Sequence, residues 1–400
     1  MTKKLNKQRL FEISFIFWTL CNIVLQFTTV ADRIGWYGRV LLKDITLIVF
    51  AVCLVIIFFL EKYKKSEFLW IIFLLIVSLL SFFKTRSFTF LSIFLFVCAS
   101  KNINLEKVFH KLFWSELAIC TLVIIFALVG LIQNRNSQDV DGISRICFGF
   151  VHPNSCGAIM INLSFLNVLL YKGRMRLWNY GLLIGLIVLN IIGPKCKTAI
   201  VILCLLTLFV LILSTDSKWI KQTVSAFLKR VPVILIVFSF IGVVLYSKGS
   251  TFIMMLNEFL STRLYQMSYF WERYNVNLFG QTLDIINSGA ASYTTQAHAL
   301  DNGYLYLVLG YGLIPFVVFC FFMIKVVQKI ALSKEHTLMV VFILMLVVGF
   351  METILFKIEL NSLLLLYAWV LFREDNHCPH TDTSKYSDKR LGRHLDLTGV

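Results

Sequence analysis

Long apolar stretches without charged residues recur along most of this chain. Residues 45–60, for example, contain only apolar side chains and one threonine. In lipid every backbone N–H and C=O must be paired within the protein, so only α-helices and closed β-barrels cross a membrane. The apolar runs cover roughly 15–25 residues and do not alternate with polar residues, which favours helices. The sequence therefore predicts an all-α, polytopic integral membrane protein.

Composition supports this class. Hydrophobic residues make up 58% of the 400 residues and the mean hydropathy is +0.80, whereas soluble domains are roughly 45–50% apolar. We place about twelve transmembrane helices near residues 10–29, 40–60, 68–82, 87–99, 109–132, 147–170, 177–193, 198–214, 231–246, 301–324, 337–351 and 355–372. The predicted organisation is a first set of transmembrane helices (1–246), a large extracytoplasmic loop with an amphipathic helix (247–300), the last transmembrane helices (301–372) and a cytoplasmic tail (373–400).

The positive charge of the chain is distributed unevenly between the predicted loops. The formal net charge is +16. With the N-terminus inside, about two-thirds of the Lys and Arg residues fall on the cytoplasmic side of the predicted spans, as the positive-inside rule requires. This bias predicts cytoplasmic termini and an outer location for the segment 246–302. Because topology explains the basicity, we exclude nucleic acid as a partner.

Cysteines and histidines give little sign of a metal site. The ten cysteines include no CxxC pair, and most lie in apolar stretches, where a thiol behaves as a small hydrophobic group. Cys147, Cys156 and Cys196 are the one set to examine for pairing near the outer face. Two histidines flank Cys378 in the polar tail, which is too small a set for a metal site. We predict no metal and no cofactor.

A first outer segment combines polar residues with a proline. Arg145 leads into His152-Pro153-Asn154. Because proline removes a backbone donor and clashes with the preceding turn, we expect this span to be kinked or broken near its outer end. His152 and Asn154 then line a cavity, or His152 has a structural role and bonds a neighbouring helix.

A second outer segment, Gly193-Pro194-Lys195-Cys196-Lys197-Thr198, brings two ammonium groups together at the headgroup level. Their charges and the N-terminus of the following helix suit an anion. We expect Thr198 to cap that helix. The anion is either a ligand of the protein or ordinary lipid phosphate.

Two features are expected on the cytoplasmic side. Glu116 lies within a predicted span, and we expect it to pair with Lys111 or His110. The stretch 214–230 combines apolar and basic residues at helical spacing, which predicts an amphipathic helix in the membrane interface.

The long polar segment 246–302 contains a helical pattern of its own. Six residues follow at spacings of three and four and so share one helix face: Leu256, Leu260, Arg263, Met267, Phe270 and Tyr274. A buried arginine in the middle of an apolar face requires an anion, either a carboxylate of the fold or an anionic ligand. We favour the ligand. Alternatively, Ser261 or Thr262 caps a new helix and the stripe consists of two pieces.

The segment ends in His298, followed by Asp301 and Asn302, directly before the next predicted span. Asp301 and Asn302 are typical of residues at a helix start. An imidazole with a pKa of about 6.5 accepts a proton at neutral pH, and a carboxylate such as Asp301 can orient it. His298 is therefore a candidate general base, with a structural role as the alternative.

Several short motifs occur in a characteristic order. They are His152-Pro153-Asn154, Lys197-Thr198-Ala199, Ser261-Thr262-Arg263, Asn277-Leu278-Phe279-Gly280, and His298 followed by Asp301-Asn302-Gly303-Tyr304. With the polytopic pattern and one large outer loop, this order resembles the Wzy-type polysaccharide polymerases and the related O-antigen ligases, over residues 110–325. The chain departs from that family at Lys197, where arginine is usual, and in the spacing from His298 to Asn302.

The resemblance implies a metal-independent, inverting membrane glycosyltransferase of GT-C-like architecture in the bacterial cytoplasmic membrane. It implies that oligosaccharide repeat units carried on undecaprenyl pyrophosphate are polymerised at the outer face into O-antigen, capsule or exopolysaccharide. Membrane lipid surrounds such a protein, and a chain-length regulator and a flippase are candidate partners.

The chemistry requires fixed positive charges for the pyrophosphate leaving group and a base for the acceptor hydroxyl. Our hypothesis assigns Arg263 and Lys197, assisted by Arg145 or Arg273, to the pyrophosphate. His298 is the base, with Asp301 beside it. The candidate sugar-binding aromatic residues are Tyr265, Tyr269, Trp271 and Tyr293.

Two other functions use a similar architecture. A transporter or flippase of lipid-linked sugars also has about twelve spans, but it should show paired ionisable groups or interrupted helices near the bilayer midplane, and internal repeats. A ligase would transfer the glycan to another acceptor by the same chemistry.

Overall fold

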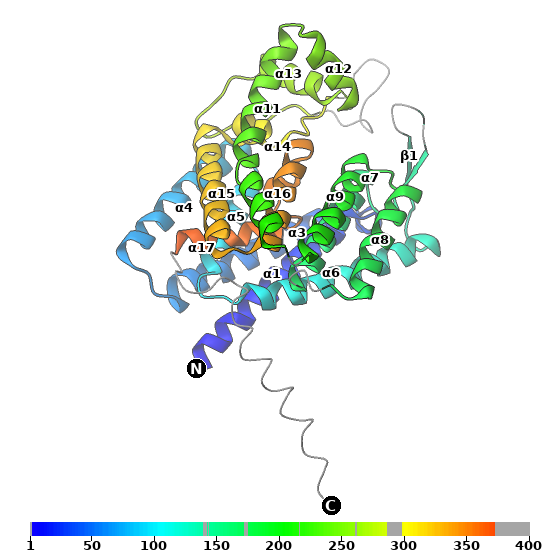
Figure 1. Cartoon of the computed structure of the whole chain (residues 1–400). Helices are drawn as coiled ribbons and strands as arrows, with labels where there is room; N and C mark the ends of the chain where they lie inside the picture. The colour runs from blue at the N-terminus through cyan, green and yellow to red at the C-terminus, as the bar shows by residue number, and fades with distance from the viewer. Residues whose placement is uncertain are drawn as a thin grey trace, which may run out of the picture.

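The computed structural model describes residues 2–138, 142, 144–171, 175–215, 217–260, 262–285 and 298–372. These residues are predominantly α-helical (Figure 1), with one small antiparallel hairpin of β1 (Asn136–Gln138) and β2 (Ser144–Ile146). Within them, eight helices are long and apolar enough to cross a membrane. The expected class, an all-α membrane protein, is therefore supported by the structure.

The helices follow most of the predicted apolar stretches, but the prediction of one span over 301–324 is wrong, because that stretch is divided and its long helix covers 313–333. The longer ones are α1 (Thr2–Phe27), α3 (Trp36–Val55, continued by the π-helical turn η1, Ile56–Leu60), α4 (Lys65–Thr85), α6 (Leu105–Leu128), α7 (Pro153–Leu170), α9 (Lys197–Ser214), α11 (Val231–Ser247) and α15 (Leu313–Ser333). Shorter apolar helices are α5 (Thr89–Ala99), α8 (Leu177–Ile192) and α16 (His336–Met351). The remaining elements are α2 (Val30–Ile34), α10 (Lys218–Leu228), α12 (Thr251–Phe259), α13 (Arg263–Arg273), α14 (Gly303–Tyr306), η2 (Leu307–Tyr311), η3 (Thr353–Phe356), η4 (Ser362–Leu366) and α17 (Tyr367–Leu371).

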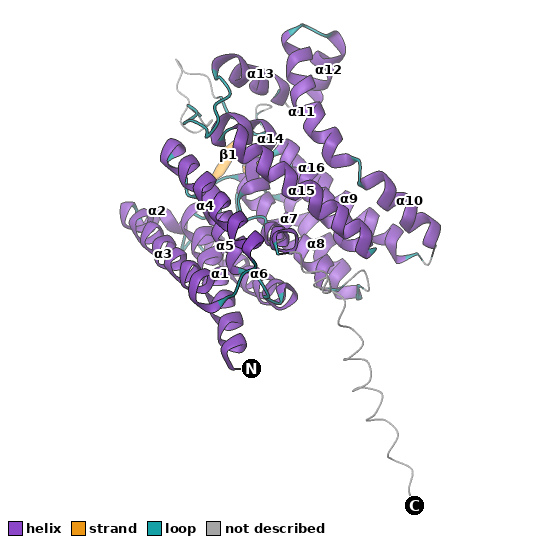
Figure 2. Ribbon diagram, turned by 90° about the vertical axis from the view of Figure 1, so that its left-hand side faces the viewer, coloured by secondary structure: helices purple, strands orange, loops and turns teal. Residues whose placement is uncertain are grey.

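The bundle has two distinct ends. We call the end at which α7 and α9 begin and α16 ends the site end, and the end at which α1 and α4 begin and α15 ends the basic end. Helices α12 and α13 lie beyond the site end, whereas the N-terminus lies at the basic end (Figure 1). Figure 2 shows α10 at the side of the bundle, with α11 rising from it towards α12.

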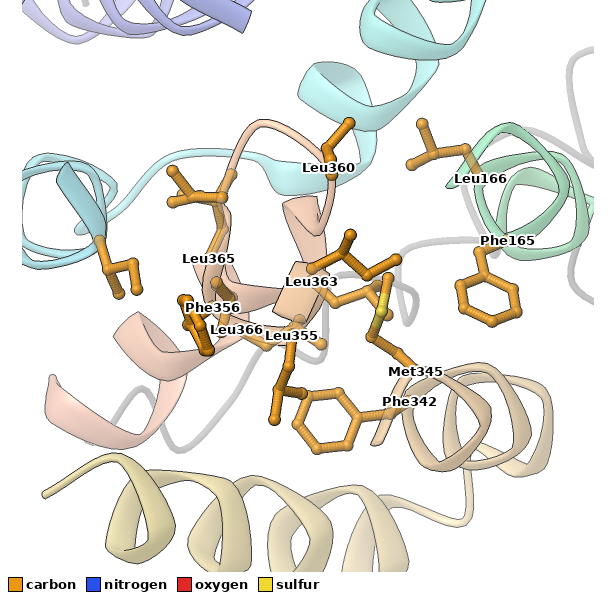
Figure 3. Packing of buried hydrophobic residues seen from close by; sticks show 14 of the residues in the cluster. Phe165, Leu166, Phe342, Met345, Leu355, Phe356, Leu360, Leu363, Leu365 and Leu366 are labelled. Carbon is orange, nitrogen blue, oxygen red and sulfur yellow. The ribbon is translucent and has the colours of Figure 1, made fainter. Parts of the chain in front are cut away.

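The centre of the bundle contains short and irregular segments. All residues of α5 from Phe90 to Ala99 are buried. The chain after α16 turns back through η3 and η4, whose leucines pack against Phe342 and Met345 of α16 and near Phe165 and Leu166 of α7 (Figure 3). The dense apolar packing of these segments joins the two halves of the sequence into one core.

The prediction of a continuous helix over 355–372 is wrong, because only η4 and α17 are helical after Phe356. Asn361 ties the irregular segment together: its side-chain amide nitrogen donates to Leu355 O at 2.6 Å, and its backbone N–H makes one helix-like bond to Lys357 O at 2.8 Å. Irregular backbone is tolerated at membrane depth where protein surrounds it, as it does here.

The outer segment is anchored in a break between η2 and α15. The N–H groups of Leu313 and Ile314, at the start of α15, donate to the carbonyls of Asn277 and Leu278 at 2.9 and 3.1 Å. At the crossing, Gly280 has φ +86° and Gly312 has φ +105°. Positive φ and this close backbone approach both require glycine.

Replacing Gly280 by alanine is expected to destabilise the fold by about 2–5 kcal/mol, from positive-φ strain and overpacking. A Cβ at this position would lie 2.1 Å from the carbonyl oxygen of Gly310. The matched control is Gly130→Ala, which has φ +78° but nothing within 4 Å of its Cβ. Thermal unfolding of the detergent-solubilised protein measures both. Equal losses for the two variants would show that the close approach is unimportant.

Two cytoplasmic-side expectations have different outcomes. Residues 218–228 form the helix α10, and Trp219 and Phe227 on it are exposed, as the amphipathic pattern predicted. Glu116 does not pair with Lys111 or His110. Its fully buried carboxylate accepts two hydrogen bonds from the amide nitrogen of Asn162 on α7, at 3.1 and 2.8 Å.

Candidate functional site

A cluster of charged and polar side chains lies at the site end, where α7, α9, α13 and α16 meet. Arg263 is at its centre. Its Nη2 donates to Glu352 Oε1 at 3.0 Å, and its Nε lies 3.8 Å from Asp301 Oδ2. The arginine side chain is only 16% exposed. Of the two anions expected for Arg263, a carboxylate of the fold or a ligand, the structure provides the carboxylates.

A break between α12 and α13 positions Arg263. Thr262 adopts a left-handed conformation, with φ +63°, and Arg263 is the first residue of α13. The side chain of Asn257 on α12 takes the place of an N-cap side chain for α13, because its Oδ1 accepts the Tyr265 N–H at 3.0 Å. The apolar stripe therefore consists of two helices, and the prediction of one continuous helix face is wrong. Ser261 lies outside the described residues.

Glu352 follows the last residue of α16 and binds three donors. Besides Arg263, Nδ2 of Asn154 donates to its Oε1 at 3.3 Å and Oγ1 of Thr198 at 3.4 Å. Thr198 does not cap α9 as expected, since Cys196 occupies the N-cap position and no side chain caps it. Glu352 was not among the residues expected from the sequence. The available signal was its position as the first carboxylate after the long apolar run of α16.

Asp301 is held beside Arg263 by its neighbour in the sequence. Asn302 caps α14, as expected, because its Oδ1 accepts the Leu305 N–H at 2.8 Å. The Asn302 amide nitrogen also donates to Ser239 Oγ at 3.1 Å and to Phe350 O at 3.0 Å. These bonds fix the backbone at Asp301, whose side chain remains 38% exposed.

His152 lies at the start of α7 and its Nδ1 accepts the N–H of Asn154 at 3.1 Å. Pro153 is the first residue of α7, where its missing N–H costs no helical bond. The helix therefore begins at Pro153. Of the two expected forms, a kinked span or a broken one, the kinked form is wrong. Burial lowers the pKa of His152, Asp301 raises it and Arg145 lowers it. The net lowering favours a neutral imidazole at pH 7.

Two carboxyl groups in the cluster have raised pKa values. Burial raises the pKa of Asp301, although the positive charges of Arg263, of His152 when it is protonated, and of Lys357 act in the opposite direction. Burial, followed by repulsion from Asp301, raises the pKa of Glu352, and Arg263 opposes this. Asp301 is therefore a stronger base than an ordinary surface carboxylate.

The other cations fall into two groups. Arg145, on β2, is close enough for its charge to act on His152, and Lys197 is the first residue of α9, next to Thr198. Arg273 is exposed at the other end of α13, where it donates to the Tyr269 hydroxyl at 3.1 Å. The structure thus brings Arg145 near the cluster and leaves Arg273 apart, whereas Lys197 is exposed and is placed only by its position beside Thr198.

The side chain of His298 packs against α13 and does not contact Asp301. Its ring stacks on Tyr269 with centroids 3.8 Å apart and an interplanar angle of 5°. Its Nδ1 is 3.4 Å from Oε1 of Gln266. The expected pair of His298 and Asp301 is therefore not formed, and His152 is the histidine whose pKa Asp301 affects.

The expected aromatic platform is not assembled on one surface. Tyr265 is exposed and meets Tyr246 edge-on, with centroids 6.4 Å apart. Trp271 packs against Phe240 of α11, at 6.0 Å. Only Tyr269 stacks on another candidate residue. Tyr293 lies outside the described residues.

Cysteine chemistry and metal binding find no support among the described residues. Cys147, Cys156 and Cys196 are free thiols. In the part of the chain that the structure describes, no three His, Cys, Asp or Glu side chains are grouped as metal ligands. Cys378 and its neighbouring histidines lie outside that part.

Comparisons of the chain with protein-family models, curated proteins and solved structures give no match. The functional interpretation therefore rests on the cluster itself. A fixed guanidinium between two carboxylates, with further cations and an accessible carboxylate at its edge, can bind an anion and accept a proton.

Replacing Glu352 by glutamine is expected to destabilise the protein by about 2 kcal/mol, because the acceptor for the Arg263 guanidinium changes from a charged carboxylate to a neutral amide oxygen. Thermal unfolding in detergent measures the loss. The control is Glu258→Gln, an exposed carboxylate on α12, for which we expect a change within about 0.5 kcal/mol. A similar effect of both changes would argue against a specific role for the Glu352–Arg263 pair.

Proposed function

We propose that this protein polymerises oligosaccharide repeat units, carried on undecaprenyl pyrophosphate, into surface polysaccharide at the outer face of the bacterial cytoplasmic membrane. The proposal includes the predicted spans other than 355–372, cytoplasmic termini and an outer position for the site end. The observation that supports it is that Arg263 contacts Asp301 and Glu352, while Asn154 and Thr198 donate hydrogen bonds to Glu352. Arg263, Asp301, Asn154 and Thr198 come from four of the motifs on which the resemblance rests, far apart in the sequence, and Glu352 joins them.

The proposed reaction is a single displacement. An acceptor sugar hydroxyl attacks the anomeric carbon of the donor, the bond from that carbon to the pyrophosphate oxygen breaks, and undecaprenyl pyrophosphate leaves with the bond electrons. The hydroxyl proton passes to a carboxylate. Inversion at the anomeric carbon follows from attack opposite the leaving group.

Positive groups at the site end suit the leaving group. Arg263, held in place by Glu352, has a planar guanidinium that can donate to phosphate oxygens. Arg145, whose charge acts on His152, and Lys197, which is next to Thr198, are assigned to add charge without a metal. Because Arg273 lies at the far end of α13, we omit it from the proposed pyrophosphate site.

Asp301 is the base that this geometry favours. It is more exposed than Glu352, whose side chain is 13% exposed and accepts bonds from three donors. Burial also raises the pKa of Asp301, which makes the carboxylate more basic. We therefore transfer the role of base from His298 to Asp301, and we assign His298 and Tyr269 to the wall of the acceptor site.

A reconstitution experiment tests the proposal. The purified full-length protein in liposomes is incubated with a defined lipid-linked repeat unit, and both the glycan products and the released undecaprenyl pyrophosphate are measured. A ladder of products with stoichiometric release of the pyrophosphate lipid supports polymerisation. One addition to a foreign acceptor indicates a ligase, and no turnover contradicts both.

One observation favours the transporter alternative. Glu116 is a fully buried carboxylate midway along α6, and Asn162 of α7 binds both of its oxygens. Ionisable groups inside a bundle often lie on transport pathways. Replacing Glu116 by glutamine should leave the product ladder unchanged if polymerisation is the function. It should abolish movement of a fluorescent lipid-linked sugar across the liposome membrane if transport is the function.

A further inference from the structure

We propose that a cleft between α4 and α15 at the basic end binds an anionic phospholipid of the adjacent leaflet. The cleft has a volume of about 520 Å³. Its lining includes Lys64 and Trp70 of the α4 side and Phe321, Lys325 and Lys329 of α15. This region lies at the opposite end of the bundle from Arg263, and the inference does not depend on the proposed function.

The membrane-facing wall of the cleft is aromatic. Trp70 stacks on Phe321 with centroids 5.9 Å apart and an interplanar angle of 13°, and it meets Phe322 edge-on at 6.2 Å. Trp70 and Phe321 remain 39% and 40% exposed. Rigid, accessible rings at the end of two apolar helices provide a surface for an acyl chain, and Trp is typical of the headgroup level.

The mouth of the cleft is positively charged. Lys64 and Lys325 are exposed at the rim, and Lys329 is fixed there because its Nζ donates to Trp369 O at 2.8 Å. The single carboxylate among the described lining residues is Glu67, which is buried and already paired with Lys101 Nζ at 2.7 Å. The exposed ammonium groups of Lys64 and Lys325 therefore supply positive charge for an anionic ligand at the rim.

A second cleft extends the binding surface around α15. It has a volume of about 540 Å³, lies on the α11 side, and shares Gln328 and Leu332 with the first. Lys229 lies in its lining, together with the apolar residues Val233 and Ile324. A phospholipid with its phosphate near Lys325 and Gln328 can place one acyl chain on each side of α15.

Charge complementarity selects the headgroup. A phosphodiester with net negative charge, as in phosphatidylglycerol, is attracted by each nearby lysine by about 1 kcal/mol. A zwitterionic headgroup gains little of this energy. The expected ligand is therefore an anionic phospholipid held at a defined position, and not the general surrounding lipid.

Fluorescence quenching tests the site. Full-length protein in detergent is titrated with phosphatidylglycerol or phosphatidylcholine that carry the same brominated acyl chains. The fluorescence of Trp70 is obtained as the difference between the wild type and Trp70→Phe. We expect saturable quenching of Trp70, with about tenfold tighter binding of phosphatidylglycerol. Changing Lys64 and Lys325 together to glutamine should remove that preference.

The control is Lys107→Gln, an exposed lysine at the basic end that does not line the cleft. It should leave the titration unchanged, and each variant should keep the unfolding temperature of the wild type. Equal binding of the two lipids, or equal effects of the Lys107 variant and the double variant, would overturn the proposal.

Discussion

Replacing Arg263 by alanine is expected to lower the polymerisation rate by about two to three orders of magnitude, the usual effect of removing a preorganised charged donor from a transition state. Arg263 is the guanidinium at the centre of the cluster, bound to Glu352 and next to Asp301. Without it the leaving pyrophosphate loses its principal cation. Release of undecaprenyl pyrophosphate by reconstituted protein provides the measurement.

Two further variants separate catalysis from stability. Removal of Arg263 leaves Glu352 without its cation, and breaking a buried ion pair costs about 3–5 kcal/mol. The double change Arg263→Ala, Glu352→Ala should recover much of the unfolding temperature but none of the activity. Arg273→Ala removes an exposed arginine from the other end of the same helix and should retain activity. Equal activity of the Arg263 and Arg273 variants would contradict the assigned role.

Replacing Asp301 by asparagine is expected to reduce the rate by a factor of about 10² to 10⁴, the contribution typical of a positioned general base. Asparagine keeps the shape of the side chain but cannot accept the proton. Single-turnover rates with a defined lipid-linked donor and acceptor measure the loss. A smaller change is expected in donor binding, because Arg263 remains in place.

The pH dependence provides an independent test of Asp301. Only the carboxylate form accepts a proton, so the rate should fall as the pH decreases through the pKa of Asp301, and burial places that pKa above the ordinary range for an aspartate. This acidic limb should disappear in Asp301→Asn. His298→Gln is the matched control, since His298 stacks on Tyr269 away from the cluster. Retention of the limb in Asp301→Asn and its loss in His298→Gln would restore His298 as the base.

Part of the candidate site could be predicted because its residues mark helix ends. Asn302 caps α14, and Pro153 starts α7, as residues with these side chains commonly do. Arg263 was identified because an arginine on an apolar face requires an anion. Local patterns of this kind depend on neighbours within a few residues, so they can be recognised without the fold.

The partners of those residues could not be predicted. Glu352 is 89 residues from Arg263 in the sequence, 154 from Thr198 and 198 from Asn154, yet it binds all three. His298 was assigned to Asp301 because they are near in sequence, but the chain directs the imidazole onto α13. In the same way, only the packing around Asn361 shows that an apolar stretch resembling a span is an irregular buried segment.

The class of this protein and the approximate positions of most of its apolar helices follow from the amino-acid sequence, because lipid imposes the same requirement of backbone pairing on every segment that enters it. The uneven distribution of Lys and Arg predicts the orientation in the membrane, because it depends only on the loops next to each span. The tertiary structure alone decided which charged groups meet at the site end. Pairing between distant residues depends on how the helices pack, and no short stretch of sequence contains that information.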